Sequence, residues 1–339
     1  MNPAILVVGP AWVGDMVMAQ SLFIELRRRH PTAAIDVLAP GWSLPLLARM
    51  PEVRAGIEMP LGHGQLGLGA RRRLGKTLRG RYRQAIVLPN SWKSALVPWV
   101  ARIPRRTGWR GEMRYGLLND LRRLDPNRLT MTVQRFVALA GEPGEPLPEI
   151  APPRLVIDPQ AVDQALAALR LERPRRLLAL CPGAEYGPAK RWPAAHFADL
   201  ARRHLAQGWT VWLFGSDKDR PVCDNVAALA PGVISLAGRT RLEQAVDLLS
   251  LADAVVSNDS GLMHVAAALD RPLAAIYGSS DPGFTPPLGR RHRILSLGLD
   301  CSPCFERRCP KGHLRCLEGI SPGRVAEALA DMDIDTERT

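Results

Sequence analysis

The strongest constraint on the fold is a repeated alternation of short apolar segments with amphipathic ones. Runs of Val, Ile, Leu and Ala bounded by turn residues predict strands, and apolar residues spaced every three to four positions predict helices. In the N-terminal half, residues 4–8, 35–38 and 83–88 are predicted strands, and 15–29 and 42–49 are predicted helices. Because strands alternating with helices form mainly parallel sheets, the chain is predicted to be an α/β protein.

The C-terminal half repeats this alternation more regularly. Its predicted strands are 176–181, 210–214, 233–236, 254–257 and 273–277. Its predicted helices are 194–207, 220–229, 242–251, 262–269 and a last one that opens at Ser321-Pro322 and runs to residue 329. Both halves are therefore expected to be Rossmann-like, with ligands bound in a cleft between them.

Residues 142–153 mark the expected domain boundary, because five prolines and three glutamates in this stretch are typical of a stiff linker. We place an N-terminal domain at 1–150, a C-terminal domain at 151–320, and a C-terminal helix and tail at 321–339. The acidic end of that tail, 331–339, is expected to fray.

Composition narrows the class of protein. A hydrophobic content of 46% in 339 residues is enough for two ordinary cores. The sequence has no apolar run of the roughly 18–20 residues that a membrane span needs, and its start lacks the features of a signal peptide. A cytoplasmic enzyme is the expectation.

The net charge of +12 indicates an acidic partner. Residues 71–83 hold seven basic side chains and no acidic one, and arginines continue the excess through 102–123. A solvated basic face is one interpretation, and a phosphorylated or lipid partner is the other. Nucleic acid is the weaker possibility, because no helix-turn-helix, RNP or zinc-finger pattern accompanies the charge.

The segment 257–264 (Ser-Asn-Asp-Ser-Gly-Leu-Met-His) lies between a predicted strand and a predicted helix. Ser260 is the predicted N-cap, and Gly261 lets a ligand approach the backbone. A helix N-terminus offers unpaired N–H groups and the positive end of a dipole, which suit a phosphate. An ordinary capped helix is the alternative.

Two other turns in the C-terminal half carry polar groups that suit a diphosphate sugar. The segment 181–193 places Lys190 and Arg191 just before a helix that Pro193 opens. After the next strand, Gly215 and Asp217 form a turn whose carboxylate can bind sugar hydroxyls. A solvated Lys-Arg pair is the competing interpretation.

The first turn of the chain, 9–14, contains two glycines but not the Gly-x-Gly-x-x-Gly spacing of a dinucleotide site. A nicotinamide oxidoreductase is therefore not expected. Asp15 follows this turn at a predicted helix start. Its carboxylate either stabilises the helix dipole or accepts a proton from a substrate hydroxyl.

Four cysteines, Cys301, Cys304, Cys309 and Cys316, lie within sixteen residues near the C-terminus, with His313 among them. Such a set can bind a structural zinc ion. The spacing matches no standard zinc ribbon, so reduced thiols and a labile disulfide remain open.

Several of these motifs together resemble the ADP-heptose:lipopolysaccharide heptosyltransferases, glycosyltransferase family 9, most closely the members that add the second heptose. The matching segments are 14–17 (Gly-Asp-Met-Val), 89–94 (Pro-Asn-Ser-Trp-Lys-Ser), 104–109 (Pro-Arg-Arg-Thr-Gly-Trp), 182–193, 258–264 and the cysteine cluster. They span nearly the whole chain.

The resemblance implies a GT-B fold, in which two Rossmann-like domains face each other across a cleft and the C-terminal helix crosses back to the first domain. It implies an inverting, metal-independent transfer of L-glycero-D-manno-heptose from ADP-heptose onto the first heptose of heptosyl-Kdo2-lipid A, without a cofactor. Heptosyltransferase I, or another member with a different acceptor, is the alternative within the family. A basic nucleotide- or nucleic-acid-binding protein is the alternative outside it.

The resemblance also implies roles for individual residues. Asp15 becomes the general base and Lys190 neutralises the departing ADP. The donor-binding residues are Gly183, Ala184, Glu185, Lys190, Arg191, Gly215, Asp217, Asp259, Ser260, Gly261 and His264. The acceptor-binding residues are Gly14, Asn90, Trp92, Lys93, Arg105 and Arg106. His264 pairing only with Asp259 is the other possibility for that side chain.

The implied partners are ADP-heptose and an anionic lipid A–Kdo–heptose acceptor, with no nucleic acid. Because that acceptor lies in the inner leaflet, the basic stretches predict a cytoplasmic enzyme attached peripherally to the inner face of the cytoplasmic membrane.

Overall fold

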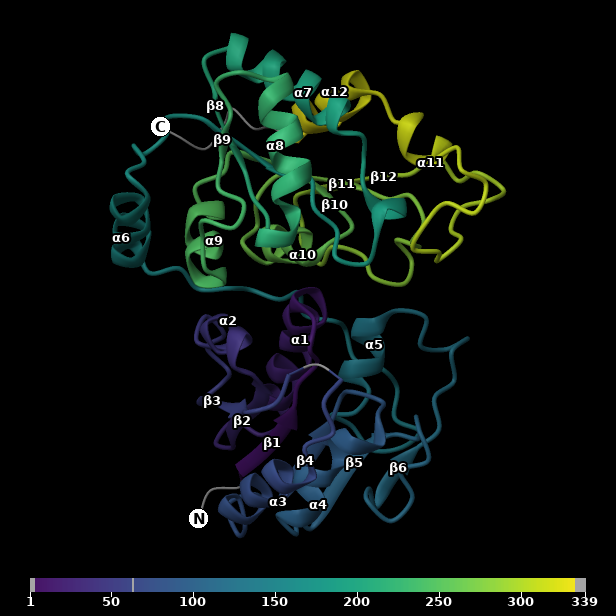
Figure 1. Cartoon of the computed structure of the whole chain (residues 1–339). Helices are drawn as coiled ribbons and strands as arrows, with labels where there is room; N and C mark the ends of the chain where they lie inside the picture. Colours follow the sequence, from purple (N-terminus) through teal and green to yellow (C-terminus); the bar gives the residue numbers. More distant parts are fainter. Residues whose placement is uncertain (1–3, 63, 333–339) are drawn as a thin grey trace. The chain divides into compact units, whose positions relative to one another are not determined.

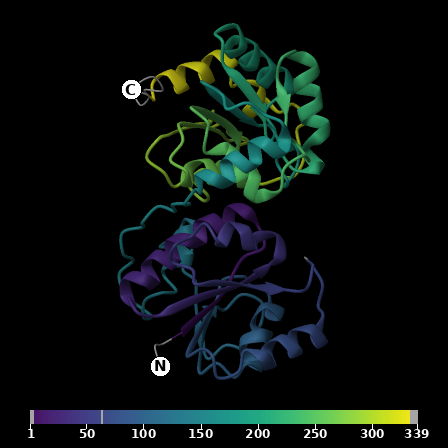
Figure 2. The same ribbon diagram turned by 90° about the vertical axis from the view of Figure 1, so that its left-hand side faces the viewer.

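The computed structural model describes residues 4–62 and 64–332, in two compact units. The units are Met1–Pro153 and Arg154–Thr339, so the division falls at the end of the proline-rich stretch 142–153. Figure 1 colours the first unit purple to teal and the second teal to yellow, and Figure 2 shows the same ribbon turned by 90°. The predicted fraying of 331–339 concerns residues that lie mostly outside the described ones.

The first unit is a parallel sheet of six strands in the order β3-β2-β1-β4-β5-β6. The strands are β1 (Ala4–Val8), β2 (Ala34–Pro40), β3 (Ala55–Met59), β4 (Gln84–Val87), β5 (Arg105–Trp109) and β6 (Asp120–Arg122). The helices are α1 (Val13–Arg29), α2 (Leu44–Leu47), α3 (Leu68–Thr77), α4 (Leu96–Val100) and α5 (Thr132–Val137), with short 3-10 turns η1 (Gly41–Ser43) and η2 (Trp92–Ala95).

The second unit repeats this order, as β12-β11-β10-β7-β8-β9. Its strands are β7 (Leu177–Cys181), β8 (Thr210–Leu213), β9 (Ile234–Ser235), β10 (Ala254–Asn258), β11 (Leu273–Ile276) and β12 (His292–Leu295). Its helices are α6 (Pro159–Leu169), α7 (Ala194–Ala206), α8 (Arg220–Leu229), α9 (Leu242–Leu249), α10 (Gly261–Ala268), α11 (Arg315–Glu318) and α12 (Pro322–Ala330), with η3 (Pro188–Lys190) and η4 (Asp217–Asp219).

The central strands of both sheets are mostly apolar because helices cover both faces. Every residue of β7 and of β10 is buried, as are four of the five in β1. Each sheet has the strand order and parallel pairing of a Rossmann fold, which confirms the predicted α/β class. No helix among the described residues has the length and apolar composition that crossing a bilayer requires.

The last helix, α12, is part of the second unit. Ser321 caps it by accepting a hydrogen bond from the N–H of Arg324 at 3.2 Å. Val325 and Leu329 are buried in the core cluster that also contains Trp192, and α12 packs against α7, β11 and β12. The apolar face of α12 therefore packs inside the second unit. The expectation that the C-terminal helix and tail cross back to the first domain stays a prediction.

Candidate active site

The predicted donor residues lie where the chain reverses direction along the second sheet. β7 and β10 are neighbours at its centre, and the chain continues from them to opposite edges. The loops that follow these two strands therefore flank the switch point at which open α/β sheets bind ligands. These loops are the predicted segments 182–193 and 258–261. In the first unit, β1 and β4 form the equivalent switch point, followed by segments 9–15 and 88–94.

Asn258 joins the two loops of the second unit. Its side chain is fully buried, its Oδ1 accepts a hydrogen bond from the N–H of Trp192 at 3.0 Å, and its Nδ2 donates to the carbonyl of Pro182 at 2.8 Å. Trp192 is itself fixed, because its Nε1 donates to the carbonyl of Ile320 at 2.9 Å. A single amide thus sets the distance between the predicted phosphate loop and the start of α10.

This arrangement brings two predicted donor residues, Lys190 and Asp259, into contact. Their Nζ and Oδ2 atoms lie 2.5 Å apart, and the two side chains are 17% and 6% exposed. The ammonium group of Lys190 also lies 5.2 Å from the centroid of the Tyr186 ring. A partly desolvated cation is therefore held at the switch point, where a phosphate would arrive.

His264 lies in the first turns of α10 and is buried. Desolvation lowers its pKa to about 4, an effect that Asp259 opposes and Lys190 reinforces. The imidazole is therefore neutral near pH 7. This protonation state argues against a charged His264–Asp259 pair. It leaves one ring nitrogen able to donate a hydrogen bond and the other able to accept one.

Ser260 occupies the N-cap position of α10, as predicted, but its hydroxyl makes no capping hydrogen bond. Its Oγ instead lies 3.2 Å from the Oγ of Ser257. The predicted side-chain cap is therefore wrong, because the buried Ser257 competes for that hydroxyl. The first N–H groups of α10 consequently have no partner from the Ser260 side chain.

Two glycines predicted to bind the donor, Gly183 and Gly215, pack against Asp219. A Cβ at Gly183 would lie 2.4 Å from Cγ of Asp219, and one at Gly215 would lie 2.8 Å from its Cβ. The Asp219 carboxylate also accepts hydrogen bonds from the N–H and Oγ of Ser216 at 2.9 and 2.7 Å. The side chain of Asp219 therefore leaves room only for small residues at these two positions. This role for Asp219 was not predicted from the sequence.

Three other predicted donor residues make contacts within the second unit. Glu185 forms an ion pair with Lys218 at 2.6 Å, and Asp217 forms one with Arg220 at 3.0 Å. Arg191 donates to the carbonyl of Ala184 at 3.3 Å, which fixes the loop. These exposed pairs are weak, so a ligand can replace them at small cost.

In the first unit, Gly14 and Asp15 lie in the first turn of α1, directly after the switch-point turn, and both are half-buried. Trp12 precedes the helix and is 49% exposed. A carboxylate at this position is stabilised as an anion by the helix N-terminus.

The predicted acceptor residues divide into two groups. Asn90, Trp92 and Lys93 follow β4 beside the switch point, where the N–H of Trp92 donates to Glu112 Oε2 at 3.1 Å and Lys93 Nζ donates to the carbonyl of Gly64 at 3.0 Å.

Arg105 and Arg106 form the second group, and they lie on β5. Arg105 binds Glu142 and Asp120 through paired hydrogen bonds, and its pKa is raised chiefly by Glu142. Arg106 donates to the carbonyls of Leu117 and Ile103 at 2.7 and 2.6 Å. Both guanidinium groups are therefore hydrogen-bonded within the first unit, close to the edge strand β6.

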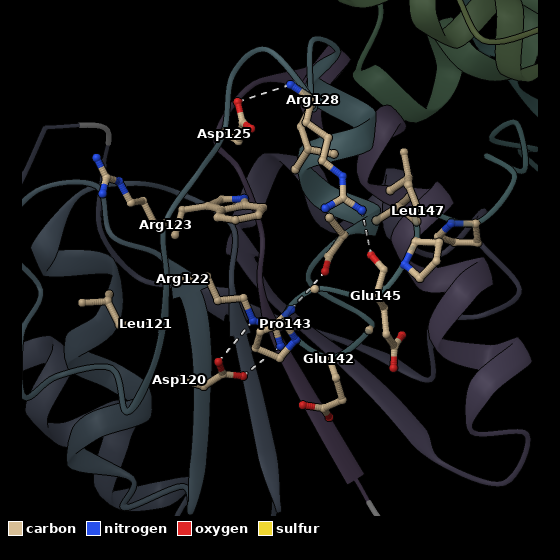
Figure 3. A pocket seen from close by; sticks show the side chains of 18 of the residues that line it. Asp120, Leu121, Arg122, Arg123, Asp125, Arg128, Glu142, Pro143, Glu145 and Leu147 are labelled. Atoms are coloured by element: carbon tan, nitrogen blue, oxygen red, sulfur yellow. Dashed lines mark hydrogen bonds and ion pairs between the residues drawn. The ribbon is translucent and has the colours of Figure 1, made fainter.

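A cavity of about 320 Å³ lies beside β6 and the linker, and none of the predicted site residues lines it (Figure 3). Arg122 donates to Asp120 on the same strand at 2.9 Å, and Arg128 donates to the carbonyl of Glu145 at 3.2 Å. Its four arginines and four acidic residues balance in charge. We therefore assign the active site from the switch-point chemistry and not from the size of this cavity.

The late cysteines meet around a much smaller cavity of about 20 Å³. Cys301, Cys304, Cys309 and Cys316 line it with His313, and none of them forms a disulfide. Over residues 4–62 and 64–332, no three His, Cys, Asp or Glu side chains are arranged to hold a metal ion. Zinc at this cluster stays a prediction, which the metal content of protein purified without chelator will test.

Two buried hydroxyls near the donor loops were not predicted. Ser279 and Ser280 follow β11, are 1% and 6% exposed, and their Oγ atoms have no hydrogen-bond partner among the described residues. Unpaired buried hydroxyls are costly, so they indicate groups that a ligand or water satisfies. The sequence signal that could have identified them is a pair of serines directly after a predicted buried strand.

Two Rossmann-type sheets, each with polar loops at its switch point, define a two-domain α/β enzyme of the GT-B type. Residues 71–315 match the model of glycosyltransferase family 9 (heptosyltransferase).

Over 337 residues the chain is 50% identical to lipopolysaccharide heptosyltransferase 2 of Salmonella typhimurium, covering 96% of this chain and 97% of the relative. It is also 50% identical to lipooligosaccharide heptosyltransferase 2 of Haemophilus influenzae, covering 97% and 99%. The solved structure of Escherichia coli ADP-heptose lps heptosyltransferase II matches with a TM-score of 0.88 and 46% identity, over 99% of this chain and 100% of that one. The chain belongs to glycosyltransferase family 9 and is a heptosyltransferase.

Proposed function

We propose that this enzyme transfers L-glycero-D-manno-heptose from ADP-heptose onto the first heptose of heptosyl-Kdo2-lipid A, with inversion at the anomeric carbon. The second unit binds the donor and the first unit binds the acceptor. The observation that carries the proposal is the Lys190–Asp259 pair, which the buried Asn258 fixes at the switch point of the second sheet. The full-length similarity to heptosyltransferases 2 supports the choice of substrates.

On the donor side, Lys190 meets the diphosphate together with the N–H groups at the start of α10. Breaking the bond to the sugar leaves additional negative charge on ADP, so a cation placed there stabilises the transition state more than the ground state. Asp259 orients the Lys190 ammonium group, and neutral His264 lines the same pocket. A lysine and a helix N-terminus supply the charge stabilisation that a metal ion supplies in other transferases.

On the acceptor side, Asp15 removes the proton from the hydroxyl that attacks the anomeric carbon. Its position after the turn of the first sheet places it at the carboxyl end of β1, which is the ligand-binding edge of such sheets. Asn90, Trp92 and Lys93 are the proposed acceptor contacts next to it. Arg105 and Arg106 have a supporting role in this proposal, because their guanidinium groups are bound within the unit.

The acceptor is tested by incubating the enzyme with ADP-heptose and either Kdo2-lipid A or its mono-heptosylated form. Product mass should increase by one heptose only with the mono-heptosylated acceptor. Transfer restricted to the acceptor without heptose would identify heptosyltransferase I activity and contradict the proposal. Asp163→Asn, an exposed change on α6, is the control for activity lost during purification and assay.

Peripheral attachment to the inner membrane surface is part of the proposal. On α3, Arg72, Arg73 and Lys76 are exposed, and Leu68 at the start of this helix is 54% exposed. The helix α3 packs against α4, whose Trp99 is 49% exposed. Basic side chains beside exposed apolar ones are the composition of a helix that lies on an anionic bilayer.

A further inference from the structure

Lys190 is held by more than its carboxylate partner. The loop that carries it, residues 186–190, lies against residues 305–307 of the segment that contains the late cysteines. The N–H of Ala189 donates to the carbonyl of Arg307 at 3.1 Å, and the hydroxyl of Tyr186 donates to the carbonyl of Phe305 at 2.5 Å. Two hydrogen bonds therefore connect these segments, which are far apart in sequence.

The contact is close enough to require glycine at position 187. A Cβ on Gly187 would lie 2.5 Å from the carbonyl oxygen of Arg307, and the backbone has a φ of 157°. The partner segment is anchored in turn, because the N–H of Phe305 donates to the carbonyl of Ser279 at 2.7 Å. The loop of Lys190 is thus fixed to the end of β11, next to the unpaired hydroxyls of Ser279 and Ser280.

The Tyr186 ring completes this arrangement. The Lys190 Nζ lies 5.2 Å from the ring centroid, and the Arg307 Cζ lies 5.4 Å from it. The ring face carries a negative potential that attracts a cation within about 6 Å. Lys190 therefore has a carboxylate, Asp259, and an aromatic ring as partners, and the ring is fixed through its own hydroxyl.

We propose that Tyr186 is a positioning residue for the transfer reaction. Its ring keeps the Lys190 ammonium group in place when the carboxylate of Asp259 must share that cation with the incoming diphosphate. The inference rests on the proposed role of Lys190. It assigns no chemistry to Tyr186 itself, because the ring acts only through the lysine.

The test compares Tyr186→Phe, Tyr186→Leu and Tyr186→Trp in the full chain, with kcat and KM measured for ADP-heptose. Tyr186→Phe keeps the ring and loses only the bond to Phe305, whereas Tyr186→Leu loses both. Because a partly exposed cation–π contact corresponds to a factor of about two to five, kcat of the Leu variant should lie about two- to fivefold below that of the Phe variant. Tyr186→Trp should keep kcat at or above the Phe value.

KM for ADP-heptose should change less than kcat, because the cation gains most when the leaving group acquires charge. A structural role alone would instead lower the melting temperature of the Leu variant without separating kcat from KM. Tyr115→Leu, a change at a 62% exposed tyrosine of the first unit, is the matched control and should behave as the unmodified chain.

Lys190→Ala distinguishes this inference from the proposed function. If Lys190→Ala loses most turnover while the Phe and Leu variants have equal kcat, the positioning role of Tyr186 is wrong and the role of Lys190 stands. If Lys190→Ala retains near-normal turnover, the proposed role of Lys190 fails and the inference about Tyr186 fails with it.

Discussion

At the scale of single residues, the largest predicted effect on turnover is that of replacing Asp15. Asp15→Asn keeps the shape of the side chain but removes its ability to take a proton, so turnover should fall by about a hundredfold or more. ADP binding, measured by titration calorimetry, should stay unchanged because the proposed donor site lies in the other unit. The Asp163→Asn control should be fully active, and near-normal turnover of Asp15→Asn would remove Asp15 from the base role.

His264 gives a prediction about pH. Its folded pKa of about 4 lies below the usual value near 6.5, so protons bind preferentially to the unfolded chain as the pH falls between these values. The contribution of His264 to the free energy of unfolding is fully present above about pH 6.5. It should decrease by about 2 kcal/mol on going from pH 7 to pH 5. The difference in unfolding free energy between the unmodified chain and His264→Gln should shrink accordingly in urea titrations at the two pH values. An unchanged difference would contradict a buried neutral imidazole.

The roles of individual residues could be predicted where a polar motif lies in a loop between a predicted strand and a predicted helix. Lys190 and Asp259 were selected from two separate loops, and the structure brings them together because Asn258 bonds across both. Tyr186 and Asp219 were not given roles, since their partners Phe305 and Gly183 are distant in sequence. Arg71 was counted with a basic surface, yet it is 6% exposed and donates to the carbonyls of Leu66 and Lys93.

At the scale of secondary-structure elements, the last helix makes the most direct prediction. Leu329 on α12 is 1% exposed in the core of the second unit, so Leu329→Ala should lower the free energy of unfolding by about 2–5 kcal/mol. Glu327→Ala, on the exposed side of α12, should change it by less than about 0.5 kcal/mol. Chemical denaturation of the full chain measures both. A Leu329→Ala variant as stable as the unmodified chain would show that this helix is not part of the core.

Strands were predicted well in the centre of each sheet and poorly at the edges. Buried strands such as β7 and β10 contain continuous apolar runs and stand out in the sequence. Peripheral strands do not: the edge strand β3 is largely exposed, and β5, next to the edge strand β6, begins with two arginines. Such sequences lack an apolar run, so only pairing with a neighbouring strand defines them.

At the scale of the whole molecule, the net charge of +12 predicts binding to anionic membranes that weakens with salt. Liposomes containing anionic lipid should sediment more of the enzyme at low salt than at high salt, and neutral liposomes should sediment little. The variant Arg72→Glu/Arg73→Glu should lose most of this binding without losing turnover on a detergent-dispersed acceptor. Equal sedimentation at low and high salt would exclude an electrostatic contact.

The identical strand order of the two sheets has a consequence for biosynthesis. Each strand of the first sheet has its hydrogen-bonding neighbours within the first 122 residues, and the second sheet begins only at Leu177. Domains generally fold as units and the N-terminal one first, while the ribosome adds about 5–20 residues per second. The first unit can therefore close its sheet while the second is still being translated. Nascent chains halted just beyond the linker should already resist proteolysis over the first unit.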